Sequence, residues 1–400
     1  MMSILNNRNG NMCAAVTATI APSRTVVTSF NPRQSCDYSD RGDYVLCVAT
    51  SEERQSIGCA LSNSEIQIYD QNTLHRIHSY QRNDSLVTEM TFDTFDPNLL
   101  AATANDGSLT LYDIRLPMKP AIAITNTLRP GEEALSVSMG FDGKIAAVGS
   151  SKKGIHFYDI RETRSTLGSY SNSHKSEVTR VRFQRFNKST TPMLVSGSED
   201  GLACIFDTSK TTEESAIQNI LTVHSPIREV GFFGPNFDNI YCLTGSESLK
   251  LYHKDDTLCR QDYGNTREYL NSQLIRHGQP IGPIDYLVDC HWDSSSQELL
   301  MLCGSSKGDS AVFVVGDREI SPRYYLKGGH RGVIRAWSYS NIKSSFLTVG
   351  EDARMCEWER SPSKSLGNQS DKNQIVISRK RQGDSAIEKT ARQRMTIDPY

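Results

Sequence analysis

The sequence predicts an all-β fold built from a repeated unit, on three observations. The tetrapeptide Tyr-Asp-Ile-Arg ends the segment 100–115, and the same tetrapeptide ends the segment 145–161. Related segments, each a small-residue strand, a turn with Asp or Gly and an alternating strand, return at about 40–45 residues, the spacing of propeller blades. No strong helical period is visible between them. Together these observations predict a seven-bladed β-propeller.

The seven units can be placed in order along the chain. In each one, strand residues alternate between apolar and polar, and Gly, Asp, Asn or Ser marks the turns. Their most recognisable strands lie at residues 65–70, 100–113, 145–159, 194–207, 240–252, 299–315 and 346–359.

The last unit lacks a fourth strand, because the pattern stops soon after Trp358. A closed ring of blades leaves no exposed sheet edge. Residues 25–30, Thr-Val-Val-Thr-Ser-Phe, have strand composition and precede the first unit. We therefore predict that this N-terminal strand closes the last blade; the alternative is a disordered N-terminus.

The predicted domain organisation has three parts. Residues 1–19 form a disordered N-terminus, residues 20–360 form the propeller, and residues 361–400 form a disordered basic tail. The tail holds eight Lys/Arg and four Asp/Glu, and the whole chain carries a net charge of −2, so the rest of the chain is mildly acidic.

A histidine precedes an apolar-rich strand at His174, His224 and His330. This arrangement resembles the WD40-repeat family, in which a buried network links that His to a Ser or Thr, a turn Asp and an aromatic residue. The resemblance implies a full network in the last blade, formed by His330, Thr348, Asp352 and Trp358. In the fourth blade it implies a network of His174, Ser196 and Asp200 that lacks the last hydrogen bond, because Phe206 replaces Trp. The first three blades lack a clear His, and we expect them to depend more on apolar packing.

The resemblance narrows to one subgroup of the family on residues 173–183, 195–202, 284–287 and 347–353. That subgroup implies a non-enzymatic protein–protein interaction scaffold and names no catalytic residue to transfer. Repeated blades give a rigid ring whose loops present several surfaces to other proteins or peptides.

The composition limits the partners and the compartment. A mildly acidic body is a poor candidate for direct nucleic-acid binding, and no stretch approaches the length of a membrane span. Ten cysteines show no CxxC pair and fall mostly in predicted strands. They indicate a reduced compartment, so we expect a cytoplasmic or nuclear protein.

The search for chemistry is largely negative. No nucleotide-binding, esterase or metalloprotease motif is present, so we expect no enzyme activity, no cofactor and no metal. Cys290 and His291 should point to opposite faces of one strand. The acidic pairs 132–133 and 255–256 are interpreted as solvated surface.

Basic residues near the starts of inner strands suggest a first partner site. Arginine binds carboxylate and phosphate in a bidentate manner. We therefore consider a rim site for an acidic or phosphorylated peptide at Arg180, Arg182, Arg228 and Arg335. The alternative is that these arginines pair with local acids such as Glu177 and Glu229.

The repeated Tyr-Asp-x-Arg ends suggest a second site. They resemble the WDxR box of substrate receptors in cullin ubiquitin ligases, with Tyr112 in place of Trp. By that resemblance Arg115 and Arg161 would contact the damaged-DNA-binding adaptor of such a ligase. An ordinary arginine at a blade end is the alternative.

Two further segments are left open. Residues 254–282 are longer than a connection between blades needs, and we expect either a functional loop or a lengthened outer strand and hairpin. In the tail, Arg379-Lys380-Arg381 is a short basic cluster that fits either nuclear import or solvated charge.

Overall fold

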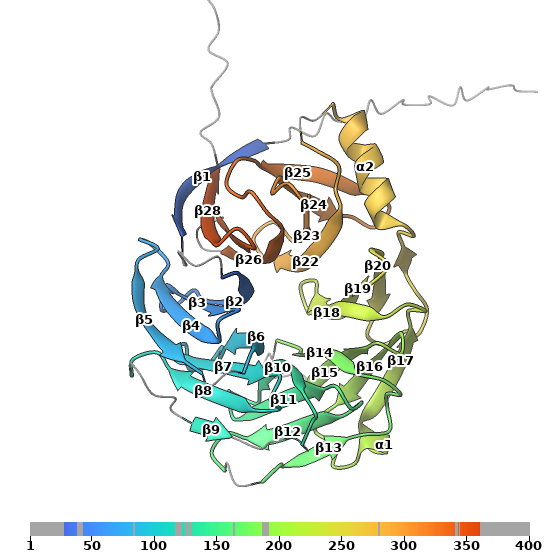
Figure 1. The fold of residues 1–400 in the computed structure, drawn as a ribbon. Helices are drawn as coiled ribbons and strands as arrows, with labels where there is room; N and C mark the ends of the chain where they lie inside the picture. Colours follow the sequence, from blue (N-terminus) through green and yellow to red (C-terminus); the bar gives the residue numbers. More distant parts are fainter. Residues whose placement is uncertain are drawn as a thin grey trace, which may run out of the picture. The chain divides into compact units, whose positions relative to one another are not determined.

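The computed structural model describes residues 28–37, 43–82, 85–116, 122–124, 128, 130–162, 165–185, 192–278, 281–340, 343 and 345–360. Its strands form seven four-stranded blades arranged in a ring (Figure 1). The innermost strand of each blade contacts the innermost strands of both neighbours, so the cycle β2, β6, β10, β14, β18, β22, β26 is closed. The predicted seven-bladed propeller is confirmed.

Each blade is antiparallel and is listed here from its inner to its outer strand. Blades one to three are β2 (Val45–Ser51), β3 (Ser56–Leu61), β4 (Glu65–Asp70) and β5 (Arg76–Gln81); β6 (Val87–Phe92), β7 (Leu99–Ala104), β8 (Leu109–Asp113) and β9 (Ile122–Ile124); and β10 (Ala134–Gly140), β11 (Ile145–Ser150), β12 (Ile155–Asp159) and β13 (Gly168–Tyr170). Blades four and five are β14 (Val178–Phe183), β15 (Met193–Ser198), β16 (Leu202–Asp207) and β17 (Ile217–Thr222); and β18 (Ile227–Phe233), β19 (Asn239–Thr244), β20 (Leu249–His253) and β21 (Gln261–Asp262). Blades six and seven are β22 (Tyr286–Asp293), β23 (Glu298–Gly304), β24 (Ser310–Val315) and β25 (Ile320–Leu326); and β26 (Ile334–Ser340), β27 (Ser345–Gly350), β28 (Arg354–Arg360) and β1 (Thr28–Asp37).

The N-terminal strand closes the last blade, as predicted, but with different bounds. β1 covers Thr28–Asp37 and pairs antiparallel with β28. Its first residues, 28–30, also pair in parallel with β25 of blade six. β1 therefore joins blades six and seven into one eight-stranded sheet. The predicted segment 25–30 overlaps this strand only at its last three residues.

The predicted N-terminal segment 1–19 and the predicted tail 361–400, with its basic cluster at 379–381, lie outside the described residues. No helix among the residues described is long and apolar enough to cross a membrane.

The core lies between neighbouring blades. Middle strands are buried on both faces, as in β23, where six of the seven residues are buried. Apolar side chains of one blade pack on those of the next, and Trp358, fully buried, joins the cluster between blades six and seven. Burying a side chain of this size stabilises the fold by about 2–3 kcal/mol, so closure of the ring and core formation depend on each other.

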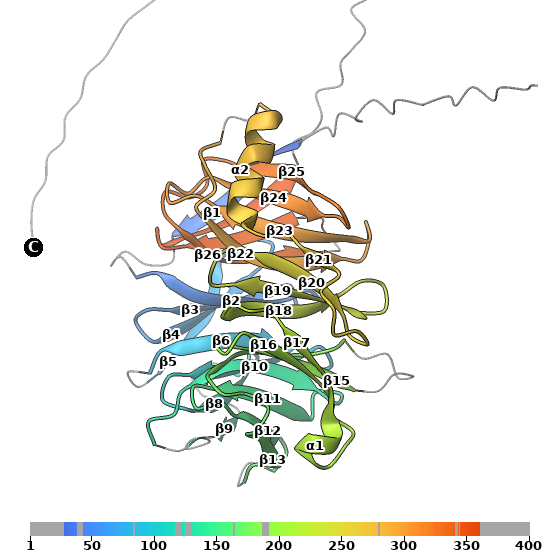
Figure 2. The same ribbon diagram turned by 90° about the vertical axis from the view of Figure 1, so that its right-hand side faces the viewer.

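The long segment 254–282 contains a helix that the sequence analysis missed. The outer strand β21 is only two residues long, and α2 (Thr266–Arg276) follows it. Asn265 caps the helix by accepting a hydrogen bond from the Glu268 backbone N–H. Leu270 and Leu274 are buried in the core between blades five and six, and the helix lies beside β25 (Figures 1 and 2). The described part of the segment therefore contributes a helix to the core between two blades and is neither a loop nor a simple hairpin. A second, one-turn helix, α1 (Glu213–Ala216), precedes β17.

Candidate partner-binding site

The inner strands share one irregularity that shapes the central channel. In all seven, the pairing shifts by one residue just after the strand begins. A bulge of this kind re-aims the side chain that follows it. The residues at this equivalent position are Cys47, Glu89, Ser136, Arg180, Glu229, Asp289 and Ala336. Six of them line a channel cavity of about 230 Å³, so the bulge brings three acids and one arginine to the axis of the ring.

Two ion pairs line the channel. Arg180 binds Glu229 in a bidentate manner, with both N–O distances 2.8 Å. Arg182, two residues further along β14, binds Glu89 at 2.6 Å. Glu89 also accepts hydrogen bonds from the Ser136 hydroxyl at 2.5 Å and from the Val137 N–H at 2.8 Å. Burial alone would raise the pKa of Glu89, but Arg182 and Arg180 outweigh it and hold that pKa below its ordinary value.

The third acid of the channel, Asp289, has a different environment. Its Oδ1 accepts hydrogen bonds from the Tyr241 hydroxyl at 3.1 Å and from the Cys290 N–H at 2.7 Å. Burial, reinforced by the negative charge of Glu229, raises the pKa of Asp289 to about 7. Three carboxyl groups thus share two guanidinium groups, and one carboxyl retains a proton into the neutral range.

Three of the four predicted rim arginines, Arg180, Arg182 and Arg335, line the channel cavity, whereas Arg228 is not among the residues that line it. Arg228 pairs with Glu247 at 3.2 Å and donates to the Leu287 carbonyl, and Arg335 pairs with Glu351 at 2.7 Å. Each of the four arginines is therefore held by a carboxylate of the chain itself. Of these partners, only Glu229 was named in the sequence analysis. The partners of the other three arginines, Glu89, Glu247 and Glu351, were not.

The structure brings the residues of the two blade networks together. In blade seven, His330 contacts Asp352 at 3.0 Å and Thr348 at 2.7 Å, and the Trp358 N–H donates to the same Thr348 hydroxyl at 2.6 Å. In blade four, His174 contacts Asp200 at 3.2 Å and Ser196 at 2.7 Å. Phe206 has no donor for the fourth bond.

His224 differs from the other two histidines. It is exposed and has a positive φ of 63°, so it does not enter a network. In its blade, Thr244 is instead hydrogen-bonded to Ser248 at 2.7 Å. The sequence pattern at His224 was misleading because the histidine sits in a left-handed turn that directs its side chain to solvent.

Blades two and three contain polar networks of another kind. Arg82 is nearly buried and donates to the side chains of Ser108, Thr110 and Tyr112, at 2.7–3.0 Å. Glu132 is also buried and accepts from the Ser150 hydroxyl at 2.5 Å, with His156 at 3.4 Å. The interpretation of Glu132 as solvated surface was wrong, since its side chain is buried and its carboxylate reaches inward to Ser150.

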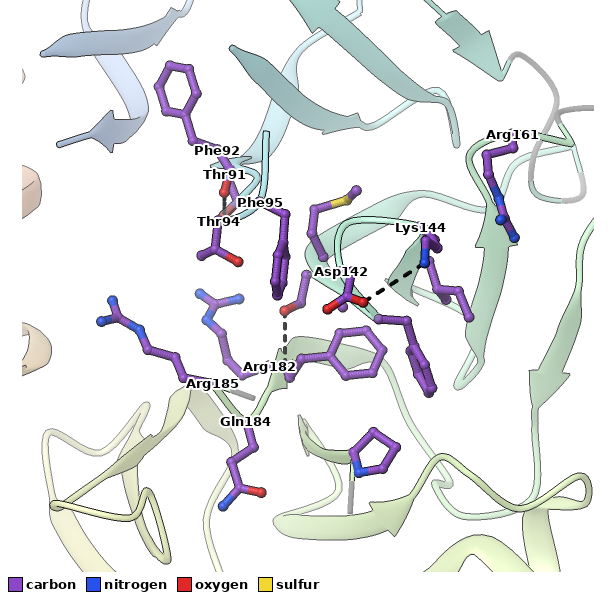
Figure 3. A pocket seen from close by; sticks show the side chains of 17 residues that line it. Thr91, Phe92, Thr94, Phe95, Asp142, Lys144, Arg161, Arg182, Gln184 and Arg185 are labelled. Carbon is purple, nitrogen blue, oxygen red and sulfur yellow. Dashed lines mark hydrogen bonds and ion pairs between the residues drawn. The ribbon is translucent and has the colours of Figure 1, made fainter. Parts of the chain in front are cut away.

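The ring has two faces, which we name by the inner strands. The start face lies where these strands begin, and holds His174 and His330. The hairpin face lies where they end, and includes residues 93–98, 141–144, 184–185 and 192. A groove of about 540 Å³ opens on the hairpin face between blades two, three and four (Figure 3).

The groove combines aromatic and basic side chains. Its apolar lining includes Phe92, Phe95, Met139, Phe141 and Phe183, and its charged lining comprises Lys144, Arg161, Arg182, Arg185 and Asp142. Figure 3 shows Phe95, Asp142 and Arg182 around its centre and Arg161 at its far edge. Phe95 is 50% exposed, a high value for a phenylalanine.

Arg115 and Arg161 occupy the same place in neighbouring blades. The backbone N–H of the preceding residue donates to the hairpin between the first two strands of the same blade, Ile114 to the Asn98 carbonyl and Ile160 to the Lys144 carbonyl, which puts both arginines on the hairpin face. Each guanidinium grips the Asp two residues earlier through its Nε at 2.8 Å and its Nη2 at 2.5 Å. More than half of each arginine side chain is exposed. This hydrogen bonding lowers the pKa of Asp113 below its ordinary value and that of Asp159 to about 2.

Other reactive residue types are accounted for by packing. Cys290 lies in the core between blades five and six, whereas His291 contacts the rings of Trp337 and Tyr339 of blade seven. Within the described part of the chain, no three His, Cys, Asp or Glu side chains are grouped so that they could hold a metal ion. Of the predicted strand cysteines, Cys59, Cys204, Cys242, Cys303 and Cys356 are buried and Cys47 is partly buried.

Comparison with known proteins supports the resemblance to WD40-repeat proteins. A sequence profile described as "WD domain, G-beta repeat" matches residues 164–207, which span the His174 network of blade four. The chain is also similar to WD-repeat proteins over most of its length. It is 27% identical over 309 residues to the WD repeat-containing protein 89 homolog of Dictyostelium discoideum, covering 77% of this chain and 80% of that protein. It is 24% identical over 349 residues to WD repeat-containing protein GTS1 of Arabidopsis thaliana, covering 83% and 85%.

The WD40 fold is also found by structural comparison. A chain in the crystal structure of the mitotic checkpoint complex superposes with a TM-score of 0.65 at 14% identity, covering 89% of this chain and 99% of that one. The subgroup suggested by the sequence is that of WD repeat-containing protein 89, and the first relative above supports it. WD40 propellers are generally protein-interaction scaffolds, and that general role applies here.

Proposed function

We propose that this WD40 propeller is a non-enzymatic interaction platform that binds its partner through the hairpin face. The observation that carries the proposal is the open groove with the half-exposed Phe95 at its mouth. Aromatic residues and arginine dominate the energetics of protein interfaces, and this face offers both. The cysteines of the described strands form no disulfide with one another, which fits a reduced compartment, so we place the platform in the cytoplasm or nucleus.

A second candidate function is docking to the damaged-DNA-binding adaptor of a cullin ubiquitin ligase. The observation that favours it is the repeated, Asp-anchored arginine in two neighbouring blades, Arg115 and Arg161. An anchored guanidinium loses little side-chain entropy on binding, because its own Asp already fixes its direction. This candidate uses the same face as the platform proposal and would make the protein a substrate receptor.

The acidic or phosphorylated peptide suggested for the rim is less favoured at that place. Such a ligand would have to displace Glu229 from Arg180, Glu247 from Arg228 or Glu351 from Arg335. A ligand carboxylate would gain little over the carboxylate it replaces. We therefore propose the hairpin face as the place where a partner's acidic groups bind.

Affinity purification with quantitative mass spectrometry tests both candidates. The wild type is compared with Phe95→Ala and with the Arg115→Ala/Arg161→Ala double variant. Two matched controls are Leu86→Ala, an exposed residue at the start of the strand that ends near Phe95, and Arg76→Ala, which breaks an exposed ion pair on an outer strand. All variants are first shown to melt like the wild type.

We expect the co-purifying proteins to fall at least about fivefold in a hairpin-face variant, a loss of about 1 kcal/mol, and to stay constant in both controls. Loss of a cullin adaptor from the double variant would establish the second candidate. Loss of partners in Leu86→Ala, with both hairpin-face variants unchanged, would contradict the platform proposal.

A further inference from the structure

The groove on the hairpin face has a composition that specifies its ligand. We propose that it binds an extended segment of a partner protein that carries one bulky apolar residue with acidic residues beside it. This inference rests on the proposed function, because it names the chemistry of the partner at the same face.

The apolar residue is required by the shape and lining of the groove. A volume of about 540 Å³ is in the range of ligand pockets. Phe141 and Phe183 pack edge to face at 5.9 Å and form one side. Phe95 stands at the mouth, where its backbone N–H is fixed by the Asp93 carboxylate at 3.1 Å. A single inserted Leu, Phe or Trp side chain would cover the exposed half of Phe95.

The acidic residues are required by the charges around the groove. Four basic residues line it against one acid, Asp142. Three of the four are each paired with a different carboxylate of the chain itself: Arg161 with Asp159, Arg182 with Glu89, and Lys144 with Asp142. Arg185 is different.

Arg185 is exposed and, among the described residues, has no carboxylate within 4 Å. Its guanidinium lies 5.8 Å from the centre of the Phe237 ring, on the blade-five side of the groove. Contact with a ring orients a guanidinium and leaves its N–H donors available. A carboxylate of the partner that reaches Arg185 therefore gains a charge-assisted bond without displacing another acid.

The surroundings favour a short acidic segment over a nucleic acid. A second cavity of about 460 Å³ shares Phe95 and Arg185 with the groove, and its lining includes Glu52, Glu53 and Asp93. A nucleic-acid backbone carries a charge at every residue and would meet these carboxylates. Phe95 and Arg185 both stand at the boundary between the two regions. A peptide can place its acids at Arg185 only and leave uncharged the part that faces Glu52, Glu53 and Asp93.

Fluorescence anisotropy with labelled nonapeptide pools tests the inference. The first pool has Leu, Phe or Trp at its centre and flanks of Ser, Gly, Asp and Glu. The second has the same centre with Lys and Arg in place of the acids, and the third has acidic flanks around a central Ala. A mixed-sequence 12-nucleotide single-stranded RNA is the polyanion control, and the proteins are the full-length wild type, Arg185→Glu, Phe95→Ala and Leu86→Ala.

We expect the wild type and Leu86→Ala to bind the first pool at least about tenfold more tightly than the other pools and the RNA, the effect of one charge-assisted bond. Arg185→Glu should lose this preference or reverse it toward the second pool, and Phe95→Ala should weaken binding of the two pools with a bulky centre while leaving the Ala-centred pool unchanged. Equal binding of the three pools, tighter binding of RNA, self-association through Phe95, or an unchanged preference in Arg185→Glu would overturn the inference. If affinity purification still shows loss of partners in Phe95→Ala, the proposed function stands and only the ligand chemistry is wrong.

Discussion

Removing residues 1–37 lowers the melting temperature of the propeller by about 10 °C or more, whereas removing residues 1–27 leaves it nearly unchanged. The longer deletion removes the whole of β1, which pairs with β28 over residues 30–37 and with β25 over residues 28–30. Its loss opens the eight-stranded sheet between blades six and seven. It also exposes one edge of β28, the strand that holds the fully buried Trp358.

Circular dichroism and tryptophan fluorescence during heating measure this effect. The shorter deletion is the control, because it removes most of the same residues and leaves β1 complete. Equal melting temperatures of the wild type and both deletions would show that β1 does not contribute to closure of the ring.

Asp289→Asn removes a pH dependence from the stability of the propeller. The pKa of Asp289 is raised from 3.8 to about 7 in the fold, so between these pH values the native state binds a proton that the unfolded chain has released. The contribution of this group to the free energy of unfolding therefore falls as pH rises through that window, by an amount on the order of 4 kcal/mol. Asparagine keeps the shape of the protonated acid, so the variant should gain stability relative to the wild type at pH 8 and little at pH 5.

Urea unfolding between pH 5 and pH 8.5 measures the difference between variant and wild type. Asp293→Asn, on the same strand β22, is the matched control with the opposite sign. Burial would raise the pKa of Asp293, but hydrogen bonds from Ser295 and Ser296 lower it, so its charge stabilises the fold at neutral pH and its removal should destabilise. A stability difference for Asp289→Asn that is constant with pH, or that is larger at pH 5, would contradict this account.

The blades, and the histidine networks of blades four and seven, were predictable because their signals are local and periodic. The strand alternation and the spacing between His330 and Asp352 are properties of one blade. The residues that meet are separated by few positions in the sequence, so the pattern within one blade was enough to predict their contact.

The channel was not predictable in the same way. The partner of Arg182 is Glu89, 93 residues away in the chain, and it was not considered from the sequence. Glu229, the partner of Arg180, was named as one alternative, but nothing in the sequence selected it over Glu177. Which side chains face the channel depends on a one-residue bulge in every inner strand, and a shift of one residue reverses the face of each side chain. Counting residues from the strand start to the same position in all seven blades is the signal that would have found Glu89 and Asp289.

The helix α2 and the bounds of β1 were missed for other reasons. α2 buries few large apolar side chains, mainly Leu270 and Leu274, so its hydrophobic period is weak. The cap formed by Asn265, with Glu268 three residues later, was the available sign. For β1, most of the strand, from Asn31 to Asp37, lacks β-branched residues, and its place is determined by the open edge of β28 and not by its own composition.

The measurement that tests the use of the hairpin face most directly is site-specific photo-crosslinking in cells. A photoreactive benzoylphenylalanine replaces Phe95 in one variant and Leu86 in the other, at the two ends of the same inner strand and both partly exposed. The account predicts a discrete crosslinked partner from position 95 and none from position 86. A partner crosslinked from position 86, with none from position 95, would show that the opposite face of the propeller binds.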